Sequence, residues 1–217
     1  IYMRFYSIFS LLFASLPINA YKLCVVGASS GLGKELVYQT SLNRNSTVLA
    51  LTTKPFLTTP CRTNSFNEIT NQPIYITNKV VKENYWNDLS RFKYEHIVFT
   101  TGARPFKDDY SDRLMCKILQ DLPDTCKTLT LVSAYGVGDS LNKNELGIVA
   151  MNQWYLDDVY RAKNEQEKMV NYNMFKNKYP NLKTFILRPR ALSYGKTLLT
   201  STSRQDLAGS ILDQLEI

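Results

Sequence analysis

The chain has 217 residues, which is enough for one domain with a full core and too few for two domains of ordinary size. Hydrophobic residues make up 44% and charged residues 21%, ordinary globular values that exclude disordered and fibrous classes. The net charge of +7 suits an anionic ligand, but the Lys and Arg residues are scattered, so no nucleic-acid partner is expected.

Residues 1–20 predict a targeting segment. From Met3, the expected start, Arg4 precedes an apolar stretch over 5–16 that resembles a secretory signal peptide. The stretch is too short to span a bilayer comfortably, so no stable membrane span is expected after its removal. A hydrophobic helix packed on the domain is the alternative. The folded domain is expected over 21–217.

After residue 20, short apolar segments alternate with amphipathic ones. Strands are predicted over 21–26, 47–51, 74–76, 96–100, 129–132 and 184–187. Helices are predicted over 33–41, 111–122, 156–179 and 205–215. Continuous apolar strands that alternate with helices are typical of a parallel sheet covered on both faces. The prediction is a single α/β domain, a Rossmann-type doubly wound parallel sheet in three αβα layers.

Four cysteines stand at wide spacings, and His96 is the one histidine, so no metal site is expected. Cys24 lies inside an apolar run, which indicates buried packing. A disulfide between Cys116 and Cys126 is compatible with the pattern but not required by it.

The segment GASSGLG follows the first strand and opens the first helix. Gly27 permits a sharp turn, Gly31 lets the backbone approach a pyrophosphate, and Gly33 lets the helix pack closely on the sheet. Ser29 and Ser30 can add hydroxyl donors. The positive end of the helix then faces the phosphates. This order of strand, loop and helix predicts a dinucleotide site.

A nucleoside-triphosphate loop fits the same segment poorly. That loop needs four residues between its glycines, followed by Lys and a hydroxyl residue. Here five residues separate Gly27 from Gly33, and Lys34 precedes Glu35.

The end of the second strand bears on cofactor choice. An NAD-selective domain places an acid there for the ribose 2′-hydroxyl, but this chain reads Thr52, Thr53 and Lys54. These side chains can donate to a 2′-phosphate, which favours NADP over NAD. A polar loop without such a role is the alternative.

The glycine loop resembles the TGxxxGxG loop of the short-chain dehydrogenases/reductases. The rest resembles their atypical NAD(P)H-binding branch, the NmrA-like and biliverdin-reductase-B-like proteins, through stretches in the same order at 99–103, 131–136, 160–167, 186–189 and 203–208. The resemblance implies cofactor contacts at Gly27, Ser29, Ser30, Gly31, Leu32, Gly33, Lys54, Thr101, Gly102, Ser133 and Lys163. The family's acid after the third strand is missing, and Asn78 is its candidate substitute.

Catalytic members of the family use Ser, Tyr and Lys, with Tyr and Lys spaced as YxxxK. Ser133, Tyr160 and Lys163 are the candidates here, but Val159 holds the position four residues before Lys163. Tyr160 lies three residues before it, so its phenol is rotated around the helix. Tyr160 is therefore expected either to act as the acid or to pack and hydrogen-bond.

Two functions remain open. The first is an NADPH-dependent reductase of a small acceptor, a flavin, quinone or carbonyl, for which Tyr135 and Tyr155 are fallback proton donors. The second is a non-catalytic NADP-binding sensor, assembly factor or scaffold. A sugar-nucleotide epimerase is disfavoured because it needs the YxxxK pair. The signal and the cofactor agree if the secretory route leads to an organelle such as a plastid, with the cytoplasm as the alternative.

Overall fold

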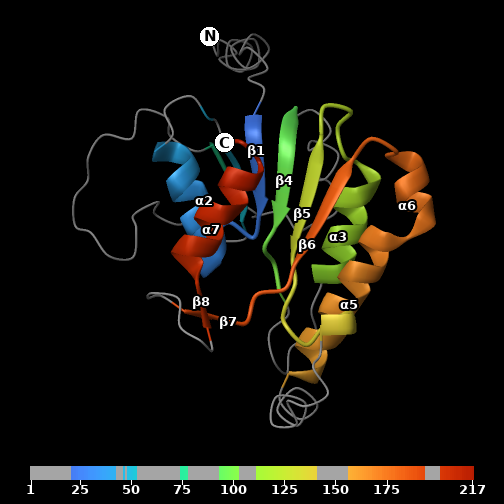
Figure 1. The fold of residues 1–217 in the computed structure, drawn as a ribbon. Coiled ribbons are helices and arrows are strands. Elements are labelled where there is room, and N and C mark those ends of the chain that lie inside the picture. Colours follow the sequence, from blue (N-terminus) through green and yellow to red (C-terminus); the bar gives the residue numbers. More distant parts are fainter. Residues whose placement is uncertain are drawn as a thin grey trace, which may run out of the picture.

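The computed structural model describes residues 21–42, 46, 48–52, 74–77, 93–102, 111–140, 156–193 and 201–217. In these ranges six strands form one parallel sheet in the order β3-β2-β1-β4-β5-β6 (Figure 1). The strands are β1 (Tyr21–Val26), β2 (Val48–Thr52), β3 (Ile74–Thr77), β4 (Tyr94–Phe99), β5 (Thr128–Val132) and β6 (Lys183–Leu187). The strand order reverses between β1 and β4, which is where doubly wound folds bind their ligands.

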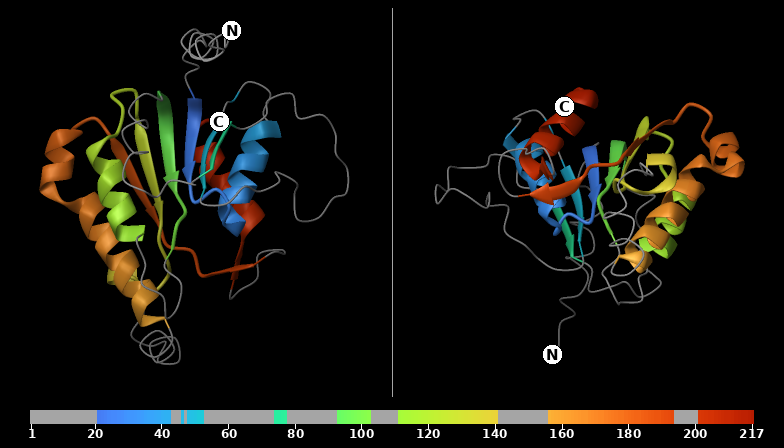
Figure 2. Two further views of the ribbon diagram at one scale, coloured as in Figure 1. Left: turned by 180° about the vertical axis from the view of Figure 1, so that it is seen from behind. Right: turned by 60° about the horizontal axis from the view of Figure 1, so that its bottom comes forward.

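Helices cover both faces of the sheet (Figure 2). One face carries α2 (Gly31–Leu42) and α7 (Arg204–Gln214), and the other carries α3 (Ser111–Gln120), α5 (Asp157–Asn171) and α6 (Asn173–Lys178). The remaining elements are the short helix η2 (Gly138–Ser140) and a small sheet of β7 (Ala191–Ser193) and β8 (Ser201–Ser203). The predicted three-layer Rossmann-type fold is confirmed.

Alternate residues of each inner strand pack on opposite layers. On β1, Leu23 and Val25 join the cluster with α2 and α7, whereas Cys24 and Val26 join the cluster with α3, α5 and α6. All four are buried, and full burial of such side chains stabilises a fold by roughly 1.5–3 kcal/mol each. Burial also raises the pKa of the Cys24 thiol. Of the cysteines in the described ranges, Cys24, Cys116 and Cys126 are free thiols, so the optional disulfide does not form.

The prediction of one long helix over 156–179 is wrong, because the backbone is extended at Tyr172, with φ −67° and ψ 134°. Val170 and Phe175 lie five residues apart and both pack in the same core cluster. On an unbroken helix, five residues correspond to about 140° of rotation, which would point them apart. The break at Tyr172 lets both side chains reach the core.

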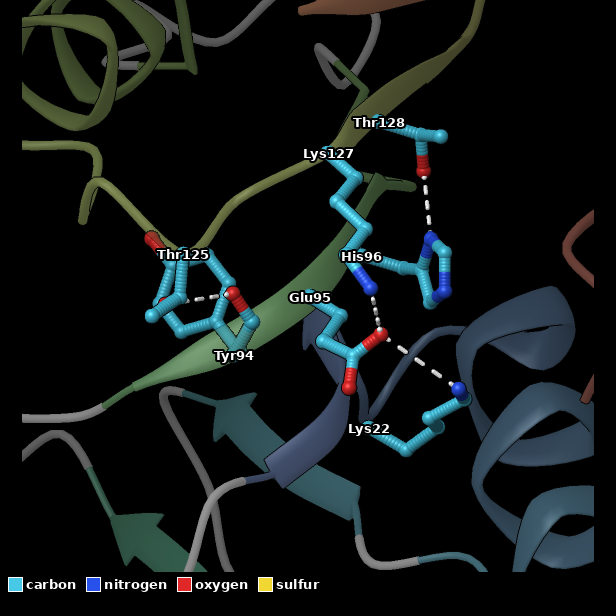
Figure 3. Close-up of polar contacts among 7 residues, drawn as sticks. All are labelled: Lys22, Tyr94, Glu95, His96, Thr125, Lys127 and Thr128. Carbon is cyan, nitrogen blue, oxygen red and sulfur yellow. Dashed lines mark hydrogen bonds and ion pairs between the residues drawn. The ribbon is translucent and has the colours of Figure 1, made fainter.

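A polar cluster closes the amino-terminal end of the central strands (Figure 3). Glu95 on β4 pairs with Lys127 at 2.7 Å and with Lys22 at 3.4 Å. The hydrogen bond from Lys127 is the main reason that the pKa of Glu95 is lowered. His96 is buried, and its Nδ1 lies 2.8 Å from the hydroxyl of Thr128. Burial, followed by the positive charge of Lys22, lowers the pKa of His96.

Two absences apply to the described ranges. No group of three or more His, Cys, Asp and Glu side chains there is placed to hold a metal ion. No helix within the same residues is long and apolar enough to cross a membrane.

Candidate dinucleotide site

The turn after β1 can be made only by glycine. Gly27 has φ +83°, a left-handed conformation, and its N–H and that of Ala28 both donate to the carbonyl of Leu51 at 3.0 Å. A Cβ atom at position 27 would lie 2.7 Å from Cγ2 and 3.0 Å from the backbone nitrogen of Thr101. The turn off β1 is therefore packed directly against the end of β4.

The first turn of α2 is packed as closely against the same loop. A Cβ atom on Gly33 would meet the carbonyl oxygen of Gly27 and would lie 2.8 Å from Cα of Ala28. The Ser30 hydroxyl accepts from the N–H of Gly33 at 3.0 Å, which makes Ser30 the N-cap of α2. It also lies 3.1 Å from the hydroxyl of Thr100. The contact of Ser30 with phosphate stays a prediction. In the structure the Ser30 hydroxyl caps α2 and lies against the hydroxyl of Thr100.

The amino-terminal end of α2 has the chemistry of an anion site. The N–H groups of Gly31 and Leu32 belong to the first helical turn, where helix geometry supplies no acceptor. No acidic residue occurs in that turn to neutralise the positive end of the helix. A pyrophosphate fits a site that combines these features with a close backbone approach at Gly27 and Gly33.

Two buried hydroxyls mark the carboxyl ends of β4 and β5. Oγ1 of Thr101 and Oγ of Ser133 are both buried and have no hydrogen-bond partner in the described part of the chain. Oγ1 of Thr130 and Oγ of Ser193 share this property in the described part of the chain. Because buried hydroxyls nearly always have a partner, Thr101 and Ser133, which stand at the strand ends, are candidates to bond a ligand there. These positions are two of the cofactor contacts that the resemblance implied, and Gly102 follows as an exposed residue.

The lysine of α5 lies at the same edge but is held by the protein. Nζ of Lys163 is 2.6 Å from the carbonyl oxygen of Thr101, 2.7 Å from that of Val132 and 3.1 Å from Oε1 of Gln166. The side chain is buried. The structure therefore brings Lys163, Thr101 and Ser133 together.

Two residues that share one face of α5 hold the loop that follows β5. The phenol of Tyr160 donates to the carbonyl of Tyr135 at 2.9 Å, and Asn164 accepts from the N–H of Gly138 at 3.1 Å. Tyr160 therefore makes a hydrogen bond within the protein, and its role as the acid stays a prediction.

Sequence reasoning missed an ion pair under this loop. Nε of Arg188 donates to Oε1 of Glu167 at 3.0 Å, and Nη2 of Arg188 donates to Oε2 of Glu167 at 2.7 Å. A Cβ atom on Gly138 would lie 3.0 Å from the Arg188 guanidinium, and Gly138 has φ +61°. Both charged residues occur in the stretches that carry the family resemblance, and this was the signal in the sequence that could have pointed to them.

Several predicted residues lie outside the described residues. They are Thr53, Lys54, Asn78 and Tyr155.

Comparison with known proteins supports the fold. No family model and no curated protein sequence matches the chain. A short-chain dehydrogenase/reductase from Veillonella parvula in complex with NADP is 14% identical with a TM-score of 0.61, over 90% of this chain and 87% of that one. A short-chain dehydrogenase from Burkholderia cenocepacia in complex with NADP is 12% identical with a TM-score of 0.51, over 93% and 86%.

A third similar structure is ChuY, an anaerobilin reductase from Escherichia coli. It is 15% identical with a TM-score of 0.50, over 88% of this chain and 89% of ChuY. At these identities the likeness concerns the fold. The chain shares its Rossmann-type fold with these short-chain dehydrogenases/reductases and with ChuY, in agreement with the resemblance in its sequence.

Proposed function

We propose that the protein binds NADP(H) and is an atypical short-chain dehydrogenase/reductase that reduces a small acceptor, a flavin, quinone or carbonyl. The observation that carries the proposal is the turn from Gly27 to Gly33, which opens α2 at the switch point of the sheet. At its two ends, Gly27 and Gly33, a Cβ atom would be too close to neighbouring atoms. A glycine loop alone is a weak signal, but this one is closely packed and opens a helix without an acid in its first turn, which supports a pyrophosphate site.

The residues present fit the cofactor at two places. The end of α2 would hold the pyrophosphate through Gly31 and Leu32, and Thr101 and Ser133 would offer their buried hydroxyls further along the edge. The bound nicotinamide supplies the hydride. The work left to the chain is to orient the cofactor and to keep water from it.

The choice of NADP over NAD rests on Thr53 and Lys54, together with the missing acid after β2. Both would donate to a 2′-phosphate, whereas an NAD-selective protein would accept from the 2′-hydroxyl there. Two structures of similar fold were solved in complex with NADP, which supports a nicotinamide dinucleotide as the ligand.

The hydrogen bond of Tyr160 bears on the reaction. Its phenol donates to a backbone carbonyl of the β5 loop and is placed as a structural group. This favours acceptors that need little proton donation by the protein, such as flavins and quinones, over carbonyls. The same observation supports the second candidate, a non-catalytic NADP-binding sensor, assembly factor or scaffold.

The site of action is also a proposal. A secretory signal over residues 3–20 and a cofactor that is scarce outside cells agree if the protein reaches an organelle such as a plastid through the secretory route. Microscopy of the tagged full-length protein tests this, and cytosolic protein that retains residues 3–20 overturns it.

The first experiment is titration of the purified protein with NADPH and NADH, followed by nicotinamide fluorescence. Tight NADPH and weak NADH binding supports the proposal, and binding of neither overturns it. Lys54→Glu is expected to weaken NADPH binding at least tenfold, a loss of about 1.4 kcal/mol, and to leave NADH binding nearly unchanged. Lys117→Glu on the exposed face of α3 makes the same charge change and is the control.

Oxidation of bound NADPH by flavins, quinones or aldehydes then separates the two candidates. Turnover with any of these acceptors supports the reductase. Binding without turnover supports the sensor or scaffold.

A further inference from the structure

The parallel pairing of β4 and β5 ends inside the candidate site. Phe99 on β4 and Leu131 on β5 are the last pair in register. Two residues beyond them along each strand stand Thr101 and Ser133. The N–H of Ser133 donates to the carbonyl of Leu187 at 2.7 Å, which continues the pairing of β5 with β6. The ends of β4 and β5 are no longer paired with each other where the two buried hydroxyls occur.

The ammonium of Lys163 bridges these two strand ends. It donates to the carbonyl of Thr101 on one side and to that of Val132 on the other, at 2.6 and 2.7 Å. Gln166, one helical turn further along α5, accepts at 3.1 Å. An ammonium has three N–H donors, so it can hold oxygens on both strand ends at once. Lys163 takes the place of the missing ladder bonds between the strands.

The same contacts fix the two hydroxyls. Lys163 holds the backbone of Thr101 itself and of Val132, the residue before Ser133. A Cβ atom on Gly102 would lie 3.5 Å from Cε of Lys163, so the lysine stem also packs along the end of β4. Oγ1 of Thr101 and Oγ of Ser133 remain buried without a partner in the part of the chain that the structure describes.

We propose that Lys163 is a positioning residue that acts through Thr101 and Ser133. It holds the ends of β4 and β5 so that the two hydroxyls face the bound dinucleotide. Its ammonium donates to protein oxygens on both strand ends, so its role is assigned to these ends and not to the cofactor ribose. This inference rests on the proposed function, because the hydroxyls need the dinucleotide as their partner.

The hydroxyls are tested first, with Thr101→Val and Ser133→Ala. Each is expected to raise the Kd for NADPH five- to tenfold, because each removes one hydrogen bond to the cofactor. The melting temperature of the free protein is expected to stay the same or to rise, since the lost hydroxyl had no partner there. Wild-type affinity in both variants overturns the inference.

Lys163 is tested by a double-mutant cycle on the Kd for NADPH. Lys163→Met keeps the length of the side chain and removes the ammonium, and we expect at least a tenfold rise in Kd. In the Thr101→Val/Ser133→Ala background the same change should add less than threefold, because the groups that Lys163 positions are gone. Additive losses would show that the lysine itself grips the cofactor, and would overturn the inference.

Gln166→Met covers the case in which Lys163→Met does not fold. It removes one acceptor and keeps the ammonium, so we expect about a threefold rise in Kd in the wild type and none in the double variant. A rise of equal size in both backgrounds overturns the inference. Lys168→Met, on an exposed position of the same helix, is the control. A wild-type protein that binds neither NADPH nor NADH overturns the proposed function itself, whereas normal binding without coupling overturns only the role of Lys163.

Discussion

The carbonyl oxygen of Gly27 occupies the space that a Cβ atom on Gly33 would need. Gly33→Ala must therefore push the first turn of α2 away from the loop that it packs against. Overpacking of this kind costs about 1–3 kcal/mol of unfolding free energy. We also expect at least a tenfold loss of NADPH affinity, because the N–H groups of that turn move. Denaturant unfolding and fluorescence titration measure the two effects.

Gly209→Ala on α7 is the matched control. A Cβ atom there would lie 3.5 Å from Oε1 of Gln39, an ordinary contact. Because alanine is the better helix former, this variant should gain about 0.5–1 kcal/mol of stability and bind NADPH as the wild type does. Equal behaviour of the two alanine variants would contradict the packing argument.

The buried histidine gives a prediction for pH. His96 is the one histidine of the chain, so a single imidazole signal in an NMR titration reports its pKa, which we expect below 6.5. As the pH falls, the imidazole is therefore protonated in the unfolded chain at a higher pH than in the folded protein. Stability from neutral His96 is fully present above pH 6.5 and is lost as the pH falls through the folded pKa.

Two variants separate the contributions at this end of the sheet. His96→Gln should reduce the fall of the unfolding free energy with decreasing pH just below pH 6.5. Glu95→Gln should keep this fall, because the stabilisation by Glu95 itself, whose pKa is lowered from 4.5, is lost only at more acidic pH. The charge of Glu95 raises the pKa of His96, so this variant should shift that pKa further down. A His96 signal that titrates above 6.5 would contradict the prediction.

The ion pair between Glu167 and Arg188 should matter for stability. Removal of one partner from a fully buried pair costs about 3–5 kcal/mol. We expect about 2–3 kcal/mol for Glu167→Gln, because the Arg188 side chain stays 26% exposed. Glu165→Gln, two residues earlier on α5, breaks an exposed pair with Lys168 and should cost at most about 0.5 kcal/mol. Chemical unfolding compares the two, and equal losses would contradict the buried role.

The parts of the fold that follow from side-chain pattern could be predicted from the sequence. Leu36 and Val37 on α2, and Met115 and Ile118 on α3, lie buried where their spacing predicted. The turn at Gly27 could be predicted as well, because a left-handed φ requires glycine.

Other features depend on partners that the sequence does not mark. Lys163 is held by the carbonyls of Thr101 and Val132, which are backbone groups that every residue carries. The break at Tyr172 arises from the core that Val170 and Phe175 share, a tertiary effect that overrides local helix preference. The three-residue strands β7 and β8 are too short for a pattern of alternation to mark them.

Tyr160→Phe tests whether the chain supplies a proton. Because the phenol donates to the carbonyl of Tyr135, its loss should cost about 1 kcal/mol of stability. Reduction of a flavin or quinone should fall by less than about threefold, whereas loss of a true general acid costs about 10²–10⁴-fold. Tyr179→Phe, which removes a phenol bonded to the carbonyl of Gln120 at 3.3 Å, controls for the lost hydrogen bond. A hundredfold fall in kcat at unchanged NADPH affinity would instead identify Tyr160 as the acid and restore carbonyls as substrates.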